Sequence, residues 1–291
     1  MAKGIFIGLA TVDVVYEVDE FPQANSKIQA RSQQIFAGGP ATNAAIAFSH
    51  LGGSPALVTV AGQHVLASAI RDEIARYDIQ LVDLNGDFDK PPAISSVCVN
   101  RTGERNVVSA NAGRIVALPA QIDEAVLDEA SIVLVDGHYL EASRVWSRAA
   151  RERGISVVFD GGSWKDGTDE LLKNVDTAIC SADFLPPGCS SERDVIEYLK
   201  GRGVARVAIT KGAEPIRFVT GESDGYVPVP QVNAVDTMGA GDIFHGAYCY
   251  FASTGRGFAE ALSEAAKVAA ESCRFSGTRD WMKHGAGART I

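Results

Sequence analysis

A glycine-rich segment directly before an apolar stretch is the part of this chain best suited to chemistry. Residues 235–246 read VDTMGAGDIFHG, and the apolar run after the glycines predicts a helix over about residues 239–254. Glycines let backbone N–H groups approach an anion closely. At the N-terminus of a helix those N–H groups are unpaired, and the helix dipole favours negative charge. We therefore interpret Gly239, Ala240 and Gly241 as a phosphate-binding cradle.

Asp242 lies in the first turn of this predicted helix, beside the cradle. A carboxylate next to an anion site is unfavourable unless it has a task, and a general base is such a task. It would take the proton of a substrate hydroxyl while the hydroxyl oxygen attacks a γ-phosphoryl group, and the cradle would stabilise charge on the transferring group. The same residues could also form only a flexible turn with an acidic helix start, and the pattern taken alone does not decide.

The composition limits the partners of the chain. Its 291 residues include 27 basic and 36 acidic side chains, for a net charge of -9, whereas binding to nucleic acid needs clustered Lys and Arg. The five cysteines are scattered, which argues against disulfides and a zinc site and suits reduced thiols in a cytoplasmic protein. No stretch has the apolar length of a membrane span, and the first residues show no signal peptide. We expect a cytoplasmic protein that binds neither nucleic acid nor membranes.

Alternating strand and helix patterns predict the fold class. Residues 4–10 read as a buried strand, and from about residue 132 onward short apolar strands alternate regularly with helices. This pattern is typical of a parallel sheet that is covered on both faces. The sequence therefore predicts a three-layer α/β/α core with a mainly parallel sheet, finished by a second helix over residues 258–272. We expect residues 1–291 to form one domain.

Two insertions into this core have a different pattern. Residues 12–37 and 93–112 mix polar and apolar side chains at short period, as strands with one exposed face do. The first insertion predicts strands at about 12–18 and 27–33. Together the insertions predict a small β lid beside the core.

A second glycine-to-helix junction lies near the other end of the chain. Residues 38–45 read GGPATNAA, with Pro40 suited to a first helical turn. Together with DTMGAGD at residues 236–242, this junction resembles the two signatures of the ribokinase-like, or PfkB, carbohydrate kinase family: an N-terminal Gly-Gly…Asn stretch and a C-terminal D-T-x-G-A-G-D stretch. The resemblance covers nearly the whole chain. It implies a ribokinase-like fold and an ATP- and Mg²⁺-dependent transferase that phosphorylates a hydroxymethyl group of a small sugar or sugar derivative, near the fructose and sulfofructose kinase branch.

The resemblance implies roles for single residues of the C-terminal half. Asp242 matches the general base of the family, and residues 239–241 match its anion hole. Asp236 matches a residue that often helps to hold a monovalent cation such as K⁺, or it only caps the turn before the helix. Residues 180–183 read CSAD where many members carry an Asn-x-x-Glu motif that organises metal-bound water. We expect Asp183 to replace part of that motif in the Mg²⁺ network.

The sugar pocket of such kinases can be assigned in the same way. Asp13 follows the first strand, where open α/β sheets place ligands, and it matches an Asp that commonly binds sugar hydroxyls. Gly39 and Asn43 would line the same pocket. The alternative is that Asp13 is an ordinary carboxylate at the end of a strand.

The nucleotide pocket is implied by the loop and helix on the other side of the motif. Residues 210–212 read TKG and resemble the nucleotide-side loop of the family, which makes Thr210 and Gly212 the expected ATP contacts. Small side chains on the last predicted helix would flank the adenine, although close helix packing explains them equally well. These side chains are Ala266, Ala269 and Cys273.

Three basic residues could select the substrate. Lys27 and Arg105 belong to the two lid insertions, and His138 follows a predicted strand. They would suit an anionic sugar, although Lys27 could instead be a solvated lid residue and His138 a structural one. A nucleoside kinase is an alternative, for which the lid offers few aromatic side chains. A non-catalytic sensor of sugar or nucleotide is an alternative of another class. Because the lid often mediates dimers in the family, we expect a homodimer through it.

Overall fold

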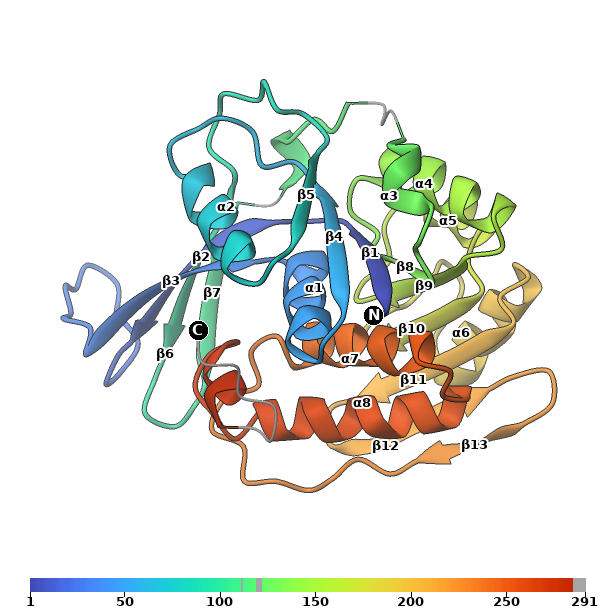
Figure 1. Cartoon of the computed structure of the whole chain (residues 1–291). Coiled ribbons are helices and arrows are strands. Elements are labelled where there is room, and N and C mark those ends of the chain that lie inside the picture. Colours follow the sequence, from blue (N-terminus) through green and yellow to red (C-terminus); the bar gives the residue numbers. More distant parts are fainter. Residues whose placement is uncertain (111, 119–121, 285–291) are drawn as a thin grey trace.

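The computed structural model of the chain describes residues 1–110, 112–118 and 122–284. Residue 111 of the expected lid and the last residues of the expected domain, 285–291, lie outside this part. A nine-stranded sheet forms the centre of the described structure (Figure 1). In order across the sheet, its strands are β13 (Asp224–Val227), β12 (Glu214–Val219), β11 (Arg206–Lys211), β10 (Thr177–Ser181), β9 (Ser156–Gly161), β8 (Ile132–Val135), β1 (Lys3–Ile7), β4 (Ser54–Thr59) and β5 (Gln80–Asp83).

The sheet is parallel from β11 to β5, and β12 runs antiparallel to both of its neighbours, β11 and β13. The central strands are apolar without alternation because both faces are covered. In β1, Phe6 belongs to the hydrophobic cluster on one face, whereas Ile5 and Ile7 belong to the cluster on the other. The predicted three-layer core is therefore confirmed.

Helices cover each face of the sheet. One face carries α1 (Pro40–His50), α2 (Ala67–Arg76), α7 (Ala240–Ser253) and α8 (Phe258–Ser272). The other carries α3 (Glu124–Leu127), α4 (Leu140–Glu152), α5 (Thr168–Leu172) and α6 (Glu192–Gly201). Two short 3₁₀ helices span Ala112–Arg114 and Asp280–Lys283. The two helices that the sequence predicted at the end of the chain are confirmed as α7 and α8, and α7 lies between α1 and α8 (Figure 1). No helix in the described part of the chain is long and apolar enough to span a bilayer.

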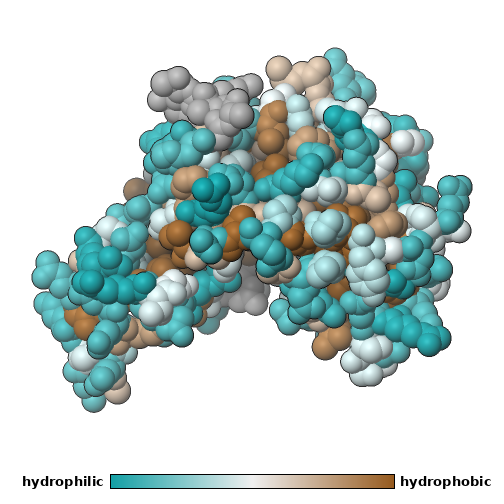
Figure 2. Space-filling view, turned by 90° about the horizontal axis from the view of Figure 1, so that it is seen from below, coloured by the Kyte–Doolittle hydropathy of each residue, from teal (hydrophilic) through white to brown (hydrophobic). Residues whose placement is uncertain are grey.

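A second sheet of four strands forms the lid and projects from one side of the core (Figure 1). Its order is β3 (Ser32–Gly38), β2 (Thr11–Glu17), β6 (Ala93–Val99) and β7 (Arg105–Ser109). Figure 2 shows the lid as a mostly hydrophilic projection, beside a band of apolar side chains across the middle of that face.

The predicted strand at residues 27–33 is wrong, because the strand there is β3 and it begins at Ser32. Its partner β2 ends at Glu17, which pairs with Ser32. Residues 27–30 therefore have no strand of that sheet to pair with, and their short polar and apolar period belongs to a loop.

Candidate active site

The N-terminus of α7 positions the expected phosphate cradle. Gly239 has a φ of 68°, and a Cβ built on it would lie 2.6 Å from Cγ2 of Thr278, so only glycine fits without a shift. The helical hydrogen-bond ladder begins with the N–H of Ile243, which donates to the carbonyl of Gly239 at 2.8 Å. The N–H of Gly241 therefore precedes the ladder and is available to an anion. The N–H of Ala240 donates to the carbonyl of Thr237 at 3.3 Å, a long bond that an anion could replace.

Asp242 lies at the meeting point of the two glycine-to-helix junctions. Nδ2 of Asn43, on α1, donates to Oδ2 of Asp242 at 2.8 Å, although the two residues are 199 positions apart. The two helices can approach closely because residue 246 is a glycine. A Cβ built on Gly246 would lie only 2.2 Å from the carbonyl oxygen of Ala44. Both junctions were visible in the sequence, and the fold brings them into direct contact.

The surroundings of Asp242 tune its acidity. Burial of the carboxyl raises its pKa to about 7, the nearby charge of Asp160 acts in the same direction, and the hydrogen bond from Asn43 opposes both. The residue as a whole still reaches solvent in part. A carboxylate with a pKa near neutrality is well suited to accept a proton at physiological pH.

The expected sugar side lies where the lid joins the core. Asp13 is on β2, and its Oδ1 accepts a hydrogen bond from the hydroxyl of Thr11 at 2.7 Å. Burial raises the pKa of Asp13. A Cβ built on Gly38 would lie 1.9 Å from Oδ2 of Asp13, and one built on Gly39 would lie 2.2 Å from the carbonyl oxygen of Leu9. The two glycines thus let the chain pass close to Asp13 before α1 begins.

The three basic residues expected to select the substrate are not brought together by any contact in the described structure. Lys27 is exposed in the loop before β3, and Arg105 is exposed at the start of β7. His138 follows β8, and its backbone N–H donates to Oδ1 of Asp136 at 2.9 Å. The lid hairpin does reach the core, since a Cβ built on Gly103 would lie 3.0 Å from the carbonyl oxygen of Val235.

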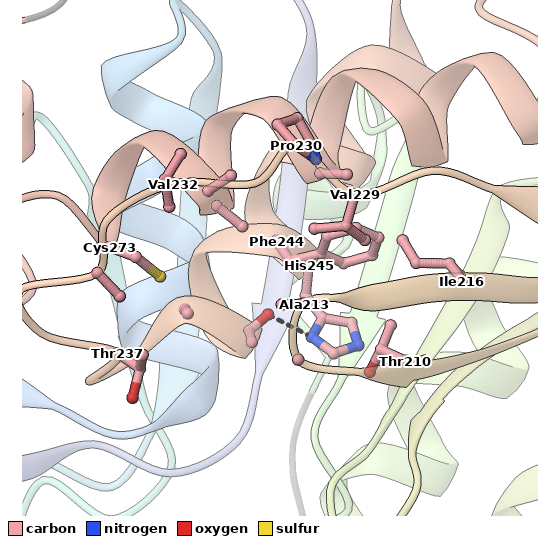
Figure 3. A pocket seen from close by; sticks show the side chains of 17 residues that line it. Thr210, Ala213, Ile216, Val229, Pro230, Val232, Thr237, Phe244, His245 and Cys273 are labelled. Carbon is pink, nitrogen blue, oxygen red and sulfur yellow. Dashed lines mark hydrogen bonds between the residues drawn. The ribbon is translucent and has the colours of Figure 1, made fainter.

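The expected nucleotide residues line one cavity of about 230 Å³ (Figure 3). All five of them contribute to its wall: Thr210, Gly212, Ala266, Ala269 and Cys273. The cavity extends to Ala240 and Gly241, so a mostly apolar pocket leads directly to the phosphate cradle. Sequence reasoning missed other parts of the wall, among them Ile216, Val229 and Val232. Those residues come from β12 and the loop after β13, where nothing in the local pattern indicates a ligand.

His245 is a further residue that sequence reasoning did not assign to the site. Its Nδ1 lies 2.7 Å from the carbonyl oxygen of Gly241, the bond drawn in Figure 3, and its Nε2 lies 3.1 Å from the carbonyl oxygen of Ile179. Oδ2 of Asp160 is 3.4 Å from Nδ1, and burial raises the pKa of Asp160. The imidazole thus holds the backbone of the cradle against β10. The available signal was its place in the helix, one turn after Asp242.

The two acidic residues expected at metal sites differ in their surroundings. Asp236 is buried, and its carboxylate accepts the N–H of Met238 at 2.9 Å and the N–H of Gly277 at 2.8 Å. The first bond caps the turn before α7, and the second ties that turn to the C-terminal segment. Asp183 is exposed after β10 and is not among the residues that line the cavity.

No group of three or more His, Cys, Asp or Glu side chains within residues 1–110, 112–118 and 122–284 is arranged to hold a metal ion. A Mg²⁺ ion that arrives with a nucleotide is held largely by phosphate oxygens and water. The cavity and cradle therefore fit MgATP without an all-protein metal cage.

Comparisons with known proteins agree with this geometry. The family model of the pfkB family carbohydrate kinases matches residues 1–284. Aminoimidazole riboside kinase of Salmonella typhimurium is 29% identical, over 94% of this chain and 88% of its own. Ribokinase of Thermotoga maritima has a similar structure, with a TM-score of 0.79, 22% identity and coverage of 96% and 95% of the two chains. Arabidopsis thaliana ribokinase, solved with ribose and ATP, gives a TM-score of 0.75 and 19% identity over 95% and 93%.

These matches confirm the resemblance that the two glycine motifs indicated, whereas the expected place near the fructose and sulfofructose kinase branch stays a prediction. The family match spans both motifs, the lid and the cavity. The chain belongs to the pfkB family of carbohydrate kinases and is an ATP-dependent sugar kinase.

Proposed function

We propose that this kinase phosphorylates a hydroxymethyl group of a small sugar or sugar derivative, with Asp242 as the general base. The observation that carries the proposal is the position of Asp242, whose carboxylate contacts Asn43 on the sugar side. One residue before it, Gly241 lines the nucleotide cavity. A base at this boundary lies between the two reactants, as direct transfer requires.

The proposed step is an in-line displacement. The substrate hydroxyl gives its proton to Asp242 as its oxygen forms a bond to the γ-phosphorus, and the bond from that phosphorus to the leaving ADP oxygen breaks. Charge that develops on the transferring group is stabilised by the backbone N–H groups of Gly239, Ala240 and Gly241. The carboxylate must be ionised to accept the proton, so its pKa of about 7 sets the lower pH limit of activity.

The two substrates, ATP and the sugar, would bind on opposite sides of Asp242. The apolar cavity suits an adenine ring, and Asp13, Gly39 and Asn43 would contact the sugar. Activation by K⁺ is part of the proposal, with Asp236 helping to shape the cation site through the loop that it ties to Gly277. Asp183 would orient metal-bound water from outside the cavity.

A riboside or nucleoside kinase is the second candidate function. It is favoured by the 29% identity to a protein named aminoimidazole riboside kinase. An anionic sugar remains the prediction from the exposed cations of the lid and from His138.

We also propose a homodimer through the lid, whose strand β7 exposes Val107 and Val108. A measurement of the molar mass of the protein in solution tests this proposal.

The experiment is a measurement of ATP turnover by purified protein with Mg²⁺, with and without K⁺. The acceptors are neutral sugars, acidic or sulfonated sugars, and ribosides. Asp242→Asn should abolish turnover while sugar binding, measured by calorimetry, is retained. Asp72→Asn, a change of the same kind on the exposed side of α2, should leave turnover unchanged. Near-normal turnover of Asp242→Asn would show that the base is another group, and binding without turnover of any acceptor would favour the sensor.

A further inference from the structure

A buried arginine near the C-terminus is hydrogen-bonded through each of its guanidinium nitrogens. Arg279 is 6% exposed. Its Nε donates to Oε1 of Glu73 at 2.7 Å, its Nη1 to Oδ1 of Asn43 at 2.9 Å, and its Nη2 to the carbonyl of Ala37 at 2.6 Å. Because every nitrogen already has an acceptor, this side chain is not placed to bind a substrate. It acts on other residues of the protein.

The bond from Arg279 fixes which way the amide of Asn43 points. An Asn side chain has a carbonyl on one side and an NH₂ group on the other, and a half-turn about its last bond exchanges them. A guanidinium has only donors, so it holds the carbonyl oxygen of Asn43 towards itself. The NH₂ group must then face Oδ2 of Asp242, to which it donates at 2.8 Å. The reversed amide would set a carbonyl oxygen against the carboxylate.

Glu73 and Arg279 also hold the base of the lid. The N–H of Ala37 donates to Oε2 of Glu73, and the carbonyl of Ala37 accepts from Arg279. Ala37 is fully buried near the end of β3, where the lid strand enters the core before α1. The guanidinium also lies 6.0 Å from the ring centre of Phe36 on the same strand. One ion pair therefore joins the lid strand, α2 and the C-terminal segment to the residue that contacts Asp242.

We propose that Arg279 is a positioning residue that locks the amide of Asn43 and thereby sets the proton affinity of the base. This inference rests on the proposed role of Asp242. The hydrogen bond from Asn43 lowers the pKa of Asp242 against the effect of burial. Without the lock, the amide turns or moves away, the carboxylate loses a donor, and its pKa rises. Because the base works in its ionised form, activity then begins only at higher pH.

The test is the pH dependence of kcat/KM for the sugar, measured for a charge-neutral pair of substitutions. Glu73→Gln with Arg279→Met removes both buried charges together, so a changed profile reports the lost lock rather than one uncompensated charge. We expect the acid limb of the profile to move up by about one pH unit, because the loss of one hydrogen bond to a carboxylate raises its pKa by about that amount. Activity should recover towards the wild-type value at high pH.

Two comparisons separate this effect from a general loss of structure. Arg274→Met removes an exposed arginine of the same segment, which pairs with Glu271 at the surface, and should leave the limb in place. Asn43→Ala should move the limb as far as the pair does, and adding the pair to Asn43→Ala should move it no further. Arg279→Lys keeps the charge but can satisfy fewer acceptors, so its limb should lie between those of the wild type and the pair variant. It replaces the pair variant in the test if that variant does not fold.

A pair variant, or Arg279→Lys in its place, whose kcat/KM falls by one factor at every pH with the limb unmoved would overturn the inference. So would a further shift when the pair is added to Asn43→Ala. If Asp242→Asn abolishes turnover and the limb does not move, only the positioning role is lost. If Asp242→Asn retains turnover, the proposed base itself is wrong.

Discussion

The core around Asp242 and the lid beside it are built in different ways. At the start of α7, backbone geometry is tightly fixed: Gly239 has a left-handed φ, a buried Thr278 fills the space beside it, and His245 holds the next turn. In the lid, every residue of β7 is exposed, and Lys27 lies in a loop. The constrained region is where we propose that phosphoryl transfer takes place. Exposed positions of the lid can be substituted at little cost in stability, so we expect substrate preference to vary there.

The largest effect should follow from filling the space at the cradle. Gly239→Ala puts a methyl group 2.6 Å from Cγ2 of Thr278 at a φ of 68°, which displaces the N–H groups, and we expect kcat to fall by about a hundredfold or more. Gly255→Ala, at the other end of α7, has the same kind of φ with nothing within 4 Å. Steady-state kinetics should show near-normal kcat for that control. Equal losses in both variants would mean that backbone strain, and not the cradle, is what matters.

An intermediate effect is expected at the nucleotide cavity. Ala269→Phe puts a phenyl ring into the cavity that Ala269 and Val232 both line, so the KM for ATP should rise about tenfold or more while the KM for the sugar changes little. Ala259→Phe makes the same change on an exposed part of α8 and should leave both constants as they are. If Ala269→Phe raises only the KM for the sugar, the two pockets have been assigned the wrong way round.

The smallest effect is expected in the lid. Lys27 is exposed, and an exposed ion pair contributes up to about 1 kcal/mol, so Lys27→Ala should raise the KM of an anionic sugar by at most about fivefold. Added salt should reduce the difference, and neutral sugars should not respond. Lys200→Ala on α6 is the matched surface control. An unchanged KM for every sugar would remove Lys27 from substrate recognition.

The same contrast explains what the sequence could and could not predict. The three-layer core and the bounds of α7 and α8 follow from local patterns, because unbroken apolar strands and glycine-bounded helices depend on neighbours in the chain. The second lid strand was misplaced because its start depends on where β2 ends. Arg279 could not be foreseen, since its partners Glu73 and Asn43 lie 206 and 236 positions away. A C-terminal arginine beside an aspartate otherwise resembles an ordinary surface residue.

The central claim is that Asp242 is the base and that burial has moved its pKa close to neutrality. The most direct test is the pH dependence of kcat/KM for the wild-type kinase with its best acceptor, beside that of Asp242→Asn. A base that works ionised gives a rate that rises with pH and levels off above its pKa, so we predict a single acid limb near pH 7. The variant should have no such limb and almost no turnover at any pH. A limb near the ordinary value of about 4 for an aspartate, or a variant that keeps the wild-type profile, would contradict the account.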